Sequence, residues 1–338
     1  MKKLIQLAKE KQVLCFYLLT FLISWTIWFM APVLTEDPDI RALMQYIGYY
    51  GPALAAIMIA GLLGLNNQPA PGLRYWITFI AFFSIVFLIN LLSLDVLGIV
   101  RNSATIALMA VIAIPAAMVL SGPVSKNRGI RRLLRYVKKA NVHWKWHLVA
   151  FFSVPVLAGI GLLIDLLLGG EPSGVYYSQP FYVEIYRGLI LYLSVFTLYG
   201  SCLGQEPGWR GFALHRLLTQ YNPLVSSIIV GSLYSLWTAP LYITGLFEEG
   251  LAGFLSQFII NIPLAIPFTW LYMKTKGSLF HVALFSASLN TFGIFIPVTE
   301  RSFVILILIS ILCIVAITME NRMWIKRDAL TPFKSFID

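Results

Sequence analysis

Apolar segments recur along almost the whole chain and are separated by short polar ones. Ten of them are long and apolar enough to form membrane-crossing helices, at residues 13–34, 45–65, 75–100, 103–121, 146–170, 183–204, 222–247, 251–273, 278–297 and 302–319. The segment at 278–297 is the most amphipathic of them. The pattern predicts an all-α, polytopic membrane helical bundle with about eight to ten transmembrane helices.

The first apolar segment follows a short basic stretch, "MKKLIQLAKEKQ", as a secretory signal peptide would. Its apolar part, "VLCFYLLTFLISWTIWFMAPVL", has 22 residues, whereas the apolar core of a signal peptide has about 7–15. No small-x-small cleavage motif follows it. We therefore expect an uncleaved first transmembrane helix.

Composition agrees with a membrane protein and excludes an ordinary soluble one. Only 12% of the residues are charged, 59% are hydrophobic, and the mean hydropathy is +0.79. A soluble chain of 338 residues needs a much larger polar surface, with about a quarter of its residues charged. No internal repeat or low-complexity segment is visible, so the chain is expected to form one membrane domain.

The net charge of +10 is explained by where the basic residues lie. If the N-terminus is cytoplasmic, 21 of the 25 Lys and Arg residues fall in cytoplasmic segments, and the outer ends hold only Arg41, Arg101, Arg187 and Arg301. The acidic clusters "TEDPD", "FEEG" and "VTE" then all lie outside. This asymmetry predicts a multi-pass protein of a bacterial plasma membrane with both termini cytoplasmic, and it requires no nucleic-acid partner.

The stretch "SKNRGIRRLLRYVKKANVHWKWH" (125–147) is basic and amphipathic, with aromatic residues at its end. It predicts a cytoplasmic segment that rests on anionic membrane lipid, in preference to a site for a protein partner. His143 and His147 stand beside Trp144 and Trp146, as residues of a membrane interface do. We interpret both histidines as interfacial residues and not as metal ligands.

The stretch "GQEPGWRGFALHR" (204–216) places polar groups at the end of an apolar segment, where unpaired ones are costly. Pro207 favours a new helix that begins near Gln205. Glu206 and Arg210 are then four residues apart on one face and can form an ion pair. A purely structural role, in which the pair only fixes the start of the helix, is the alternative to a chemical one.

Two further stretches carry polar groups inside apolar segments. In "GSLYSLWTAPLYI" (231–243), Thr238 precedes Pro240 and is expected to bond to the backbone. In "TWLYMKTKGSLFHVALFSASLNTFG" (269–293), Ser286 and Asn290 share a helix face, and a buried Asn marks a polar interior. His281 lies about 140° around the same helix, so we interpret it as a packing residue.

Together these stretches resemble the CPBP family, the CAAX-protease and bacteriocin-processing (ABI) intramembrane glutamic proteases. The family's first motif, Glu-Glu-x-Gly-Trp-Arg-Gly-Phe, matches Gln205 to Phe212 except at its first position. Its second, Trp-x-x-Trp-His-x-Pro-Leu, aligns with Tyr234 to Leu241. Its last motif, Thr-Trp-Leu-Tyr, Gly-Ser-Leu and Phe-His-Ala-Ser-x-Asn, aligns with Thr269–Tyr272, Gly277–Leu279 and Phe285–Asn290.

The resemblance divides the chain into four parts, which are N-terminal transmembrane helices (1–124), the basic segment (125–147), a CPBP/ABI-like core (148–300), and a last transmembrane helix with a cytoplasmic tail (301–338). The similarity covers about half of the chain, residues 125–295. It implies a CAAX-protease-like helical bundle.

The resemblance also implies roles for four positions, and three of them carry a different residue type. The family's general base, its assisting His, and its His and Asn that stabilise the oxyanion correspond to Gln205, Thr238, Ser286 and Asn290. A Gln amide cannot accept a proton near neutral pH, and Thr or Ser cannot carry the charge that a His carries. The sequence therefore predicts a protease fold without a protease site.

The leading hypothesis is a pseudoprotease that holds a membrane helix or a lipidated peptide, or that scaffolds a membrane protein such as a cell-wall enzyme. Bacteriocin immunity and cell-wall contexts come from family analogy alone. The alternative is an active, divergent intramembrane endopeptidase in which Glu206 is the base and Arg210 releases it. A small-solute transporter is disfavoured, because repeat symmetry and intramembrane charges are scarce.

No cofactor or metal is expected. Cys15, Cys202 and Cys313 are scattered within apolar segments, and they have neither disulfide nor metal-ligand spacing. No cluster of His, Cys and carboxylate residues has the spacing of a zinc site either.

Overall fold

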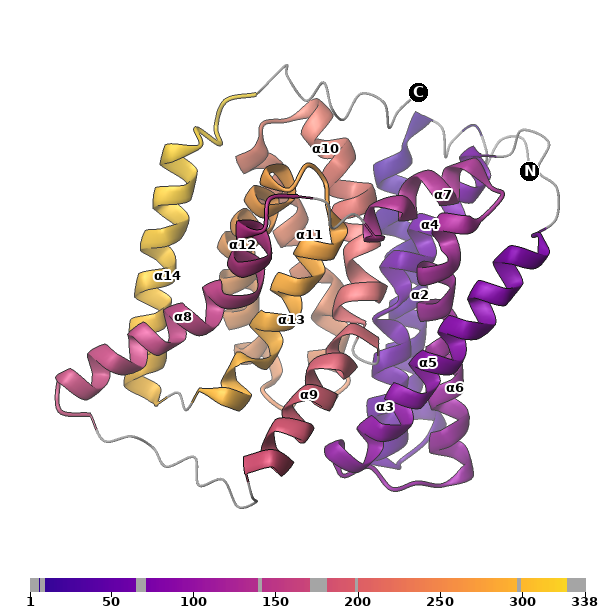
Figure 1. The fold of residues 1–338 in the computed structure, drawn as a ribbon, viewed down its shortest axis with the longest axis horizontal. Coiled ribbons are helices and arrows are strands. Elements are labelled where there is room, and N and C mark those ends of the chain that lie inside the picture. Colours follow the sequence, from indigo (N-terminus) through magenta and orange to yellow (C-terminus); the bar gives the residue numbers. More distant parts are fainter. Residues whose placement is uncertain are drawn as a thin grey trace.

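The computed structural model describes residues 6, 10–64, 71–138, 142–170, 181–197, 200–296 and 299–326, which form a bundle of helices (Figure 1). The longer ones are α2 (Gln12–Leu34), α3 (Pro38–Gly48), α4 (Gly51–Leu63), α5 (Leu73–Leu97), α6 (Ser103–Ser121), α8 (Lys145–Leu167), α9 (Phe181–Thr197), α11 (Pro223–Ile243), α12 (Gly250–Lys274), α13 (Leu279–Phe295) and α14 (Glu300–Glu320). The shorter ones are η1 (Gly122–Val124), α7 (Arg128–Leu134), η2 (Arg135–Lys138), η3 (Ser201–Gln205), η4 (Pro207–Leu214) and α10 (His215–Gln220).

In the described part of the chain, nine segments are long and apolar enough to cross a membrane. The predicted polytopic, all-helical membrane protein is thus confirmed, and the number lies within the predicted range. The apolar segment at 45–65 is only part of a span, because the helical segment already begins at Pro38. The side chain of Asp37 accepts hydrogen bonds from the backbone N–H groups of Asp39 and Ile40 and so caps that start.

An aromatic cluster forms the centre of the bundle. The rings of Trp28 on α2 and Trp237 on α11 have centroids 4.9 Å apart, and those of Trp209 on η4 and Trp237 are 5.4 Å apart. All three indoles are fully buried, as is Phe16, which stacks on Phe212. Aromatic burial therefore fixes the helix that carries Trp209, and with it the polar groups beside Trp209.

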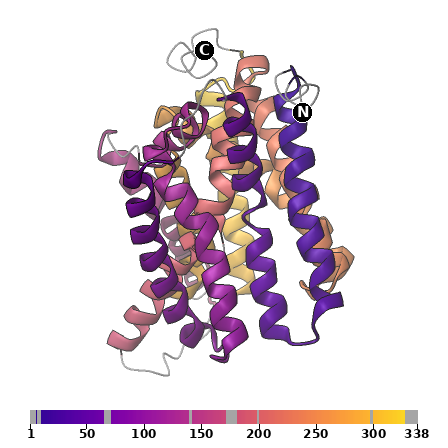
Figure 2. The same cartoon turned by 90° about the vertical axis from the view of Figure 1, so that its right-hand side faces the viewer.

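The basic segment lies at the same end of the bundle as the start of α2 and as α10 (Figure 2). Its described part folds into α7, η2 and the first turn of α8, with Leu133 and Leu134 buried against the bundle. Residues 139–141 lie outside the described residues. The same holds for several basic residues that the predicted orientation uses, namely Lys2, Lys3, Lys9, Lys139, Arg327 and Lys334.

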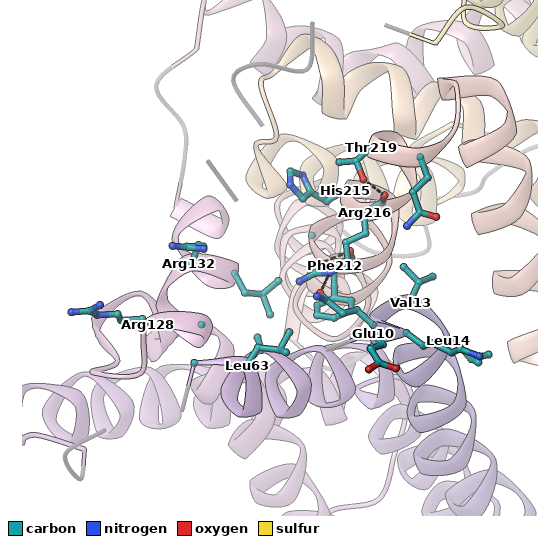
Figure 3. A pocket seen from close by; sticks show the side chains of 18 residues that line it. Glu10, Val13, Leu14, Leu63, Arg128, Arg132, Phe212, His215, Arg216 and Thr219 are labelled. Carbon is teal, nitrogen blue, oxygen red and sulfur yellow. Dashed lines mark hydrogen bonds between the residues drawn. The ribbon is translucent and has the colours of Figure 1, made fainter. Parts of the chain in front are cut away.

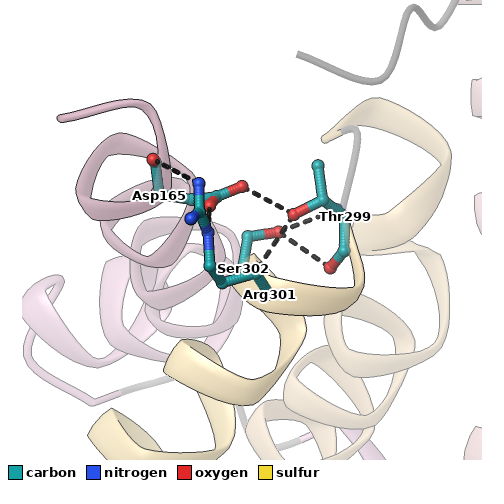
Figure 4. Close-up of polar contacts among 4 residues, drawn as sticks. All are labelled: Asp165, Thr299, Arg301 and Ser302. Atoms are coloured by element: carbon teal, nitrogen blue, oxygen red, sulfur yellow. Dashed lines mark hydrogen bonds and ion pairs between the residues drawn. The ribbon is translucent and has the colours of Figure 1, made fainter. Parts of the chain in front are cut away.

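A polar contact joins the end of α8 to the start of α14 (Figure 4). The buried carboxylate of Asp165 accepts a hydrogen bond from Thr299 Oγ1 at 2.7 Å and forms an ion pair with Arg301. The backbone N–H of Ser302 in turn donates to Thr299 Oγ1 at 2.9 Å, which caps α14. Both carboxylate oxygens of Asp165 have partners, so its buried charge is compensated.

Candidate functional site

One helical stretch, from Ser201 to Gln220, carries the first motif. It begins directly after Gly200, which has the left-handed backbone conformation, with a φ of +62°. The predicted start of the helix near Gln205 is therefore wrong by about one turn. Both η3 and η4 are wound as π-helix, with Pro207 in the first turn of η4. Such winding is rare in proteins and is frequent at functional sites.

Glycines let this helix pack directly on the backbone that joins α3 to α4. A Cβ atom added to Gly204 would lie 2.8 Å from the carbonyl oxygen of Tyr49, and one added to Gly208 would lie 2.5 Å from that of Pro52. These distances are too short for any other residue type. The roles of Gly204 and Gly208 cannot be predicted from the sequence pattern, because they depend on a three-dimensional contact.

Replacing Gly208 by Ala is expected to destabilise the protein by about 1–3 kcal/mol, because the added methyl group would push η4 away from α4. The measurement is the free energy of unfolding by dodecyl sulfate titration in mixed micelles. Gly159→Ala is the matched control, since a Cβ at Gly159 on α8 would meet nothing within 4 Å. That control should be unchanged or more stable, by up to about 1 kcal/mol. Equal losses in the two variants would contradict the packing argument.

Gln205 is buried at the end of η3, where a family protease would carry its base. Its Oε1 atom accepts a hydrogen bond from the hydroxyl of Tyr234 at 3.2 Å. Tyr234 belongs to α11, and it lies one turn before Thr238 on the same helix. The amide of Gln205 is therefore held by a hydrogen bond between two neutral groups. An amide is not basic enough to take up a proton near neutral pH, so this position provides no general base. Tyr234 was not singled out from the sequence.

Glu206 and Arg210 form the predicted ion pair. Arg210 Nη1 lies 3.0 Å from Glu206 Oε1, and the two residues are only 1% and 7% exposed, with Glu206 the more buried. The guanidinium also stacks over the ring of Phe268 on α12, with its central carbon 4.1 Å from the ring centroid. Among the described residues, the second oxygen, Glu206 Oε2, has no hydrogen-bond partner.

Thr238 has the structural role that its place before Pro240 predicts. Its hydroxyl donates to the backbone carbonyl of Ser235 at 2.8 Å, within α11. The side chain is buried, and its hydroxyl hydrogen is used in this bond to the backbone of the same helix. A hydroxyl cannot take up a proton near neutral pH, so Thr238 cannot replace a histidine in proton transfer.

The side chain of Asn290 is exposed, although the sequence predicted a buried amide in a polar interior. Its Nδ2 atom donates to the carbonyl of Ser286 at 2.7 Å. The next residue, Thr291, is buried, so Asn290 is exposed because of the face of α13 on which it lies. Ser286 itself is buried. In the described part of the chain, no hydrogen bond joins Ser286 or Asn290 to Gln205 or Glu206.

The first and last motifs do share a contact, through Cys202. The thiol of Cys202 on η3 donates to the carbonyl of Ala283 on α13 at 3.0 Å, so these two helices are adjacent. His281 on α13 is buried, as predicted for a packing residue, and its Nδ1 atom lies 2.8 Å from Ser278 Oγ. Its ring also contacts that of His147, with centroids 4.5 Å apart. The described residues contain no group of three His, Cys, Asp or Glu side chains that could hold a metal ion.

An apolar cavity of about 530 Å³ adjoins the first motif. It lies beside Cys202, Leu203 and Pro207, the residues that flank Gln205 and Glu206 on both sides. Side chains of α5, α6, η2, α9 and α13 complete its wall, among them Ile85 and Ala283. Its volume is within the range of about 300–1,000 Å³ that small-ligand sites have.

Comparisons with known proteins agree with these motifs. Residues 187–292 match the family model described as Type II CAAX prenyl endopeptidase Rce1-like. A relative named CAAX prenyl protease 2, from Methanococcus maripaludis, is 25% identical over 163 residues, which are 46% of this chain. The chain thus spans 59% of the length of that relative. Both matches support membership of the CPBP family.

Proposed function

We propose that this CPBP-family membrane protein binds a lipidated peptide or a membrane helix and does not cleave it. One observation carries the proposal: a Gln, fixed by Tyr234, stands where the family's general base belongs. An amide cannot take a proton from water at neutral pH, and general-base catalysis contributes on the order of 10²–10⁴-fold. Thr238 and Ser286, in place of two histidines, remove the charge that would assist.

The apolar cavity supports a lipid-modified ligand. A prenyl or acyl chain gains free energy by leaving water, in proportion to the apolar area that it buries. Leu203 and Pro207 line the cavity and are close chain neighbours of Gln205 and Glu206, so a chain bound in it would bring an attached peptide close to the altered site. The name of the relative, a CAAX prenyl protease, agrees with a prenylated peptide as the ligand class.

The same proposal includes the membrane context. The excess of Lys and Arg at one end of the bundle supports a plasma membrane protein with both termini cytoplasmic. A membrane enzyme of cell-wall synthesis, or a bacteriocin-related peptide, is a partner by family analogy. The protein would then hold the lipidated peptide or membrane helix and position the partner enzyme without cleaving a peptide bond.

The wild-type protein in detergent is expected to bind a farnesylated peptide, whose mass stays unchanged after long incubation. Ile85→Trp should weaken that binding about tenfold, because a larger ring at the wall of the cavity competes with the lipid chain. Binding is measured by fluorescence anisotropy of a labelled peptide, and integrity by mass spectrometry.

Ile80→Trp is the matched control, since Ile80 lies on the same helix, is 61% exposed against 54% for Ile85, and does not line the cavity. The proposal fails if the two Trp variants bind alike, or if the wild type cleaves the peptide.

A divergent endopeptidase is the second candidate function, and the unpartnered Glu206 Oε2 favours it. That oxygen could accept a proton while Oε1 remains bonded to Arg210. Peptide cleavage that survives Gln205→Ala but is lost in Glu206→Gln would establish this alternative. Cleavage lost in neither variant would exclude Glu206 as the base.

A further inference from the structure

A second cavity, of about 700 Å³, lies at the end of the bundle that carries the basic segment (Figure 3). It is built between the start of α2, the end of α4, α7 and the last turns of η4 and α10. It is separate from the apolar cavity beside the first motif, and the two share no lining residue. Neither the motifs nor the proposed function account for it.

The rim of this cavity is strongly cationic. Four basic side chains line it, Lys11, Arg128, Arg132 and Arg216, against the single carboxylate of Glu10. Figure 3 shows Arg128 and Arg132 on the α7 side of the cavity, with their guanidinium groups directed outward at its edge, and Arg216 and Glu10 on the other side. Within the described ranges, Lys11 and Arg128 form no ion pair. The positive charge of the rim is therefore only partly neutralised, which favours an anionic ligand.

Arg216 stiffens one wall. Its Nε atom donates to Gln12 Oε1 at 2.6 Å, its Nη1 atom donates to the carbonyl of Phe212 at 3.0 Å, and its guanidinium lies over the ring of Phe212. These bonds connect α10 to the start of α2. Arg216 thus contributes its charge from a fixed position.

The opposite wall is also rigid, because α7 packs closely on α4. Asn127 Nδ2 donates to the carbonyl of Gly61 at 3.1 Å, and a Cβ atom at Gly129 would lie 1.9 Å from the carbonyl oxygen of Ala60. Only a glycine at position 129 allows this approach. Arg128 and Arg132, one turn apart on α7, are therefore held at the rim by a docked helix.

The remaining wall continues into an apolar surface. Val13, Leu14, Leu63 and Leu133 line the cavity together with the basic side chains. Leu14, Leu18 and Leu22 are 51%, 61% and 64% exposed and recur every four residues along α2, so they form one outward stripe. In a membrane this stripe faces lipid. A ligand with a charged head and an apolar chain fits both surfaces at once.

We propose that this cavity binds the headgroup of an anionic glycerophospholipid, whose acyl chains lie along Leu14, Leu18 and Leu22. The phosphate would be held by the guanidinium groups of Arg128 and Arg132 at the α7 edge of the cavity, while Lys11 and Arg216 add positive charge from the other side. Such a site differs from general attraction to an acidic membrane surface, because it binds individual lipid molecules. The proposal does not depend on whether the protein cleaves or holds peptides.

Native mass spectrometry of the full chain in detergent tests the proposal. Dioleoyl phosphatidylglycerol is expected to bind at least about tenfold more tightly than dioleoyl phosphatidylcholine. Arg128→Gln/Arg132→Gln should weaken phosphatidylglycerol binding about tenfold and leave phosphatidylcholine binding unchanged. A salt titration should lower the affinity of the wild type more than that of the variant.

Lys126→Gln/Arg131→Gln is the matched control, because it removes the same charge from the same exposed segment and neither residue lines the cavity. It should change the affinity by less than about twofold. Lys11→Gln/Arg128→Gln is the second cavity variant, for the case that the loss of Arg132 impairs folding, which the melting temperature without lipid reports.

Equal losses in the cavity variants and the control would overturn the proposal, as would equal affinity for the two lipids. Inorganic phosphate is tested as a third ligand, besides the two lipids. If it binds as tightly as phosphatidylglycerol, the cavity recognises free phosphate and the assignment to lipid is wrong. If it does not compete, the lipid assignment stands.

Discussion

The triple variant Gln205→Glu, Thr238→His and Ser286→His is expected to cleave a membrane-anchored peptide that the wild-type protein binds and leaves intact. The change returns a carboxylate to the position that the motifs assign to the base and imidazoles to the two positions that they assign to histidines. A general base contributes on the order of 10²–10⁴-fold and an oxyanion donor about 10²–10³-fold, so the gain should be large. The measurement is peptide cleavage in reconstituted vesicles, followed by mass spectrometry.

The single variant Gln205→Glu is the control for the contribution of the base. It should give less activity than the triple variant, because no histidine then assists the water. Thr238 and Ser286 are both buried, so the larger imidazoles have to be accommodated, and the melting temperature of each variant must be checked. A folded triple variant that binds the peptide without cleaving it would contradict the roles that the motifs imply.

Replacing Arg210 by Ala is expected to cost about 3–5 kcal/mol of stability, because it leaves the carboxylate of Glu206 buried without its partner. The pair lies deep in the bundle, and its cation also packs on Phe268. The free energy of unfolding in mixed micelles measures the effect. Glu206→Met/Arg210→Met should recover most of the loss, because apolar residues of similar volume often replace a buried ion pair at little cost.

An exposed ion pair provides the comparison. Arg101 lies 2.5 Å from Asp95, with the two side chains 48% and 61% exposed. Arg101→Ala should therefore cost less than about 1 kcal/mol. If Arg210→Ala costs no more than Arg101→Ala, the ion pair of Glu206 does not stabilise the fold, and its carboxylate is free for another role.

Much of the bundle could be predicted because a membrane-crossing helix has to be apolar along its whole length. The segments predicted at 13–34 and 103–121 agree with α2 and α6 to within one residue. The pairing of Glu206 with Arg210 could also be predicted, since residues four apart on a helix meet. Both the helix bounds and the ion pair follow from residues that are close together in the sequence.

The features that could not be predicted depend on packing between distant segments. Hydropathy does not show that α3 and α4 are separate helices, or that η3 and η4 are wound as π-helix. It gives the depth of Asn290 in the membrane but not the direction of its side chain, which is exposed. Likewise, Gly208 has its role only because the backbone at Pro52 approaches it.

The contact of Asp165 with Thr299 and Arg301 has a consequence for the order in which the protein assembles. During synthesis α14 enters the membrane after the helices of the motifs, and its surface is mostly apolar and outward-facing. Apolar packing alone distinguishes poorly between neighbouring helices in lipid, where no hydrophobic driving force acts between them. A compensated carboxylate at the end of α8 gives α14 one docking position in which its own polar start is satisfied. The last described helix is thereby directed to α8 at the edge of the bundle (Figure 1).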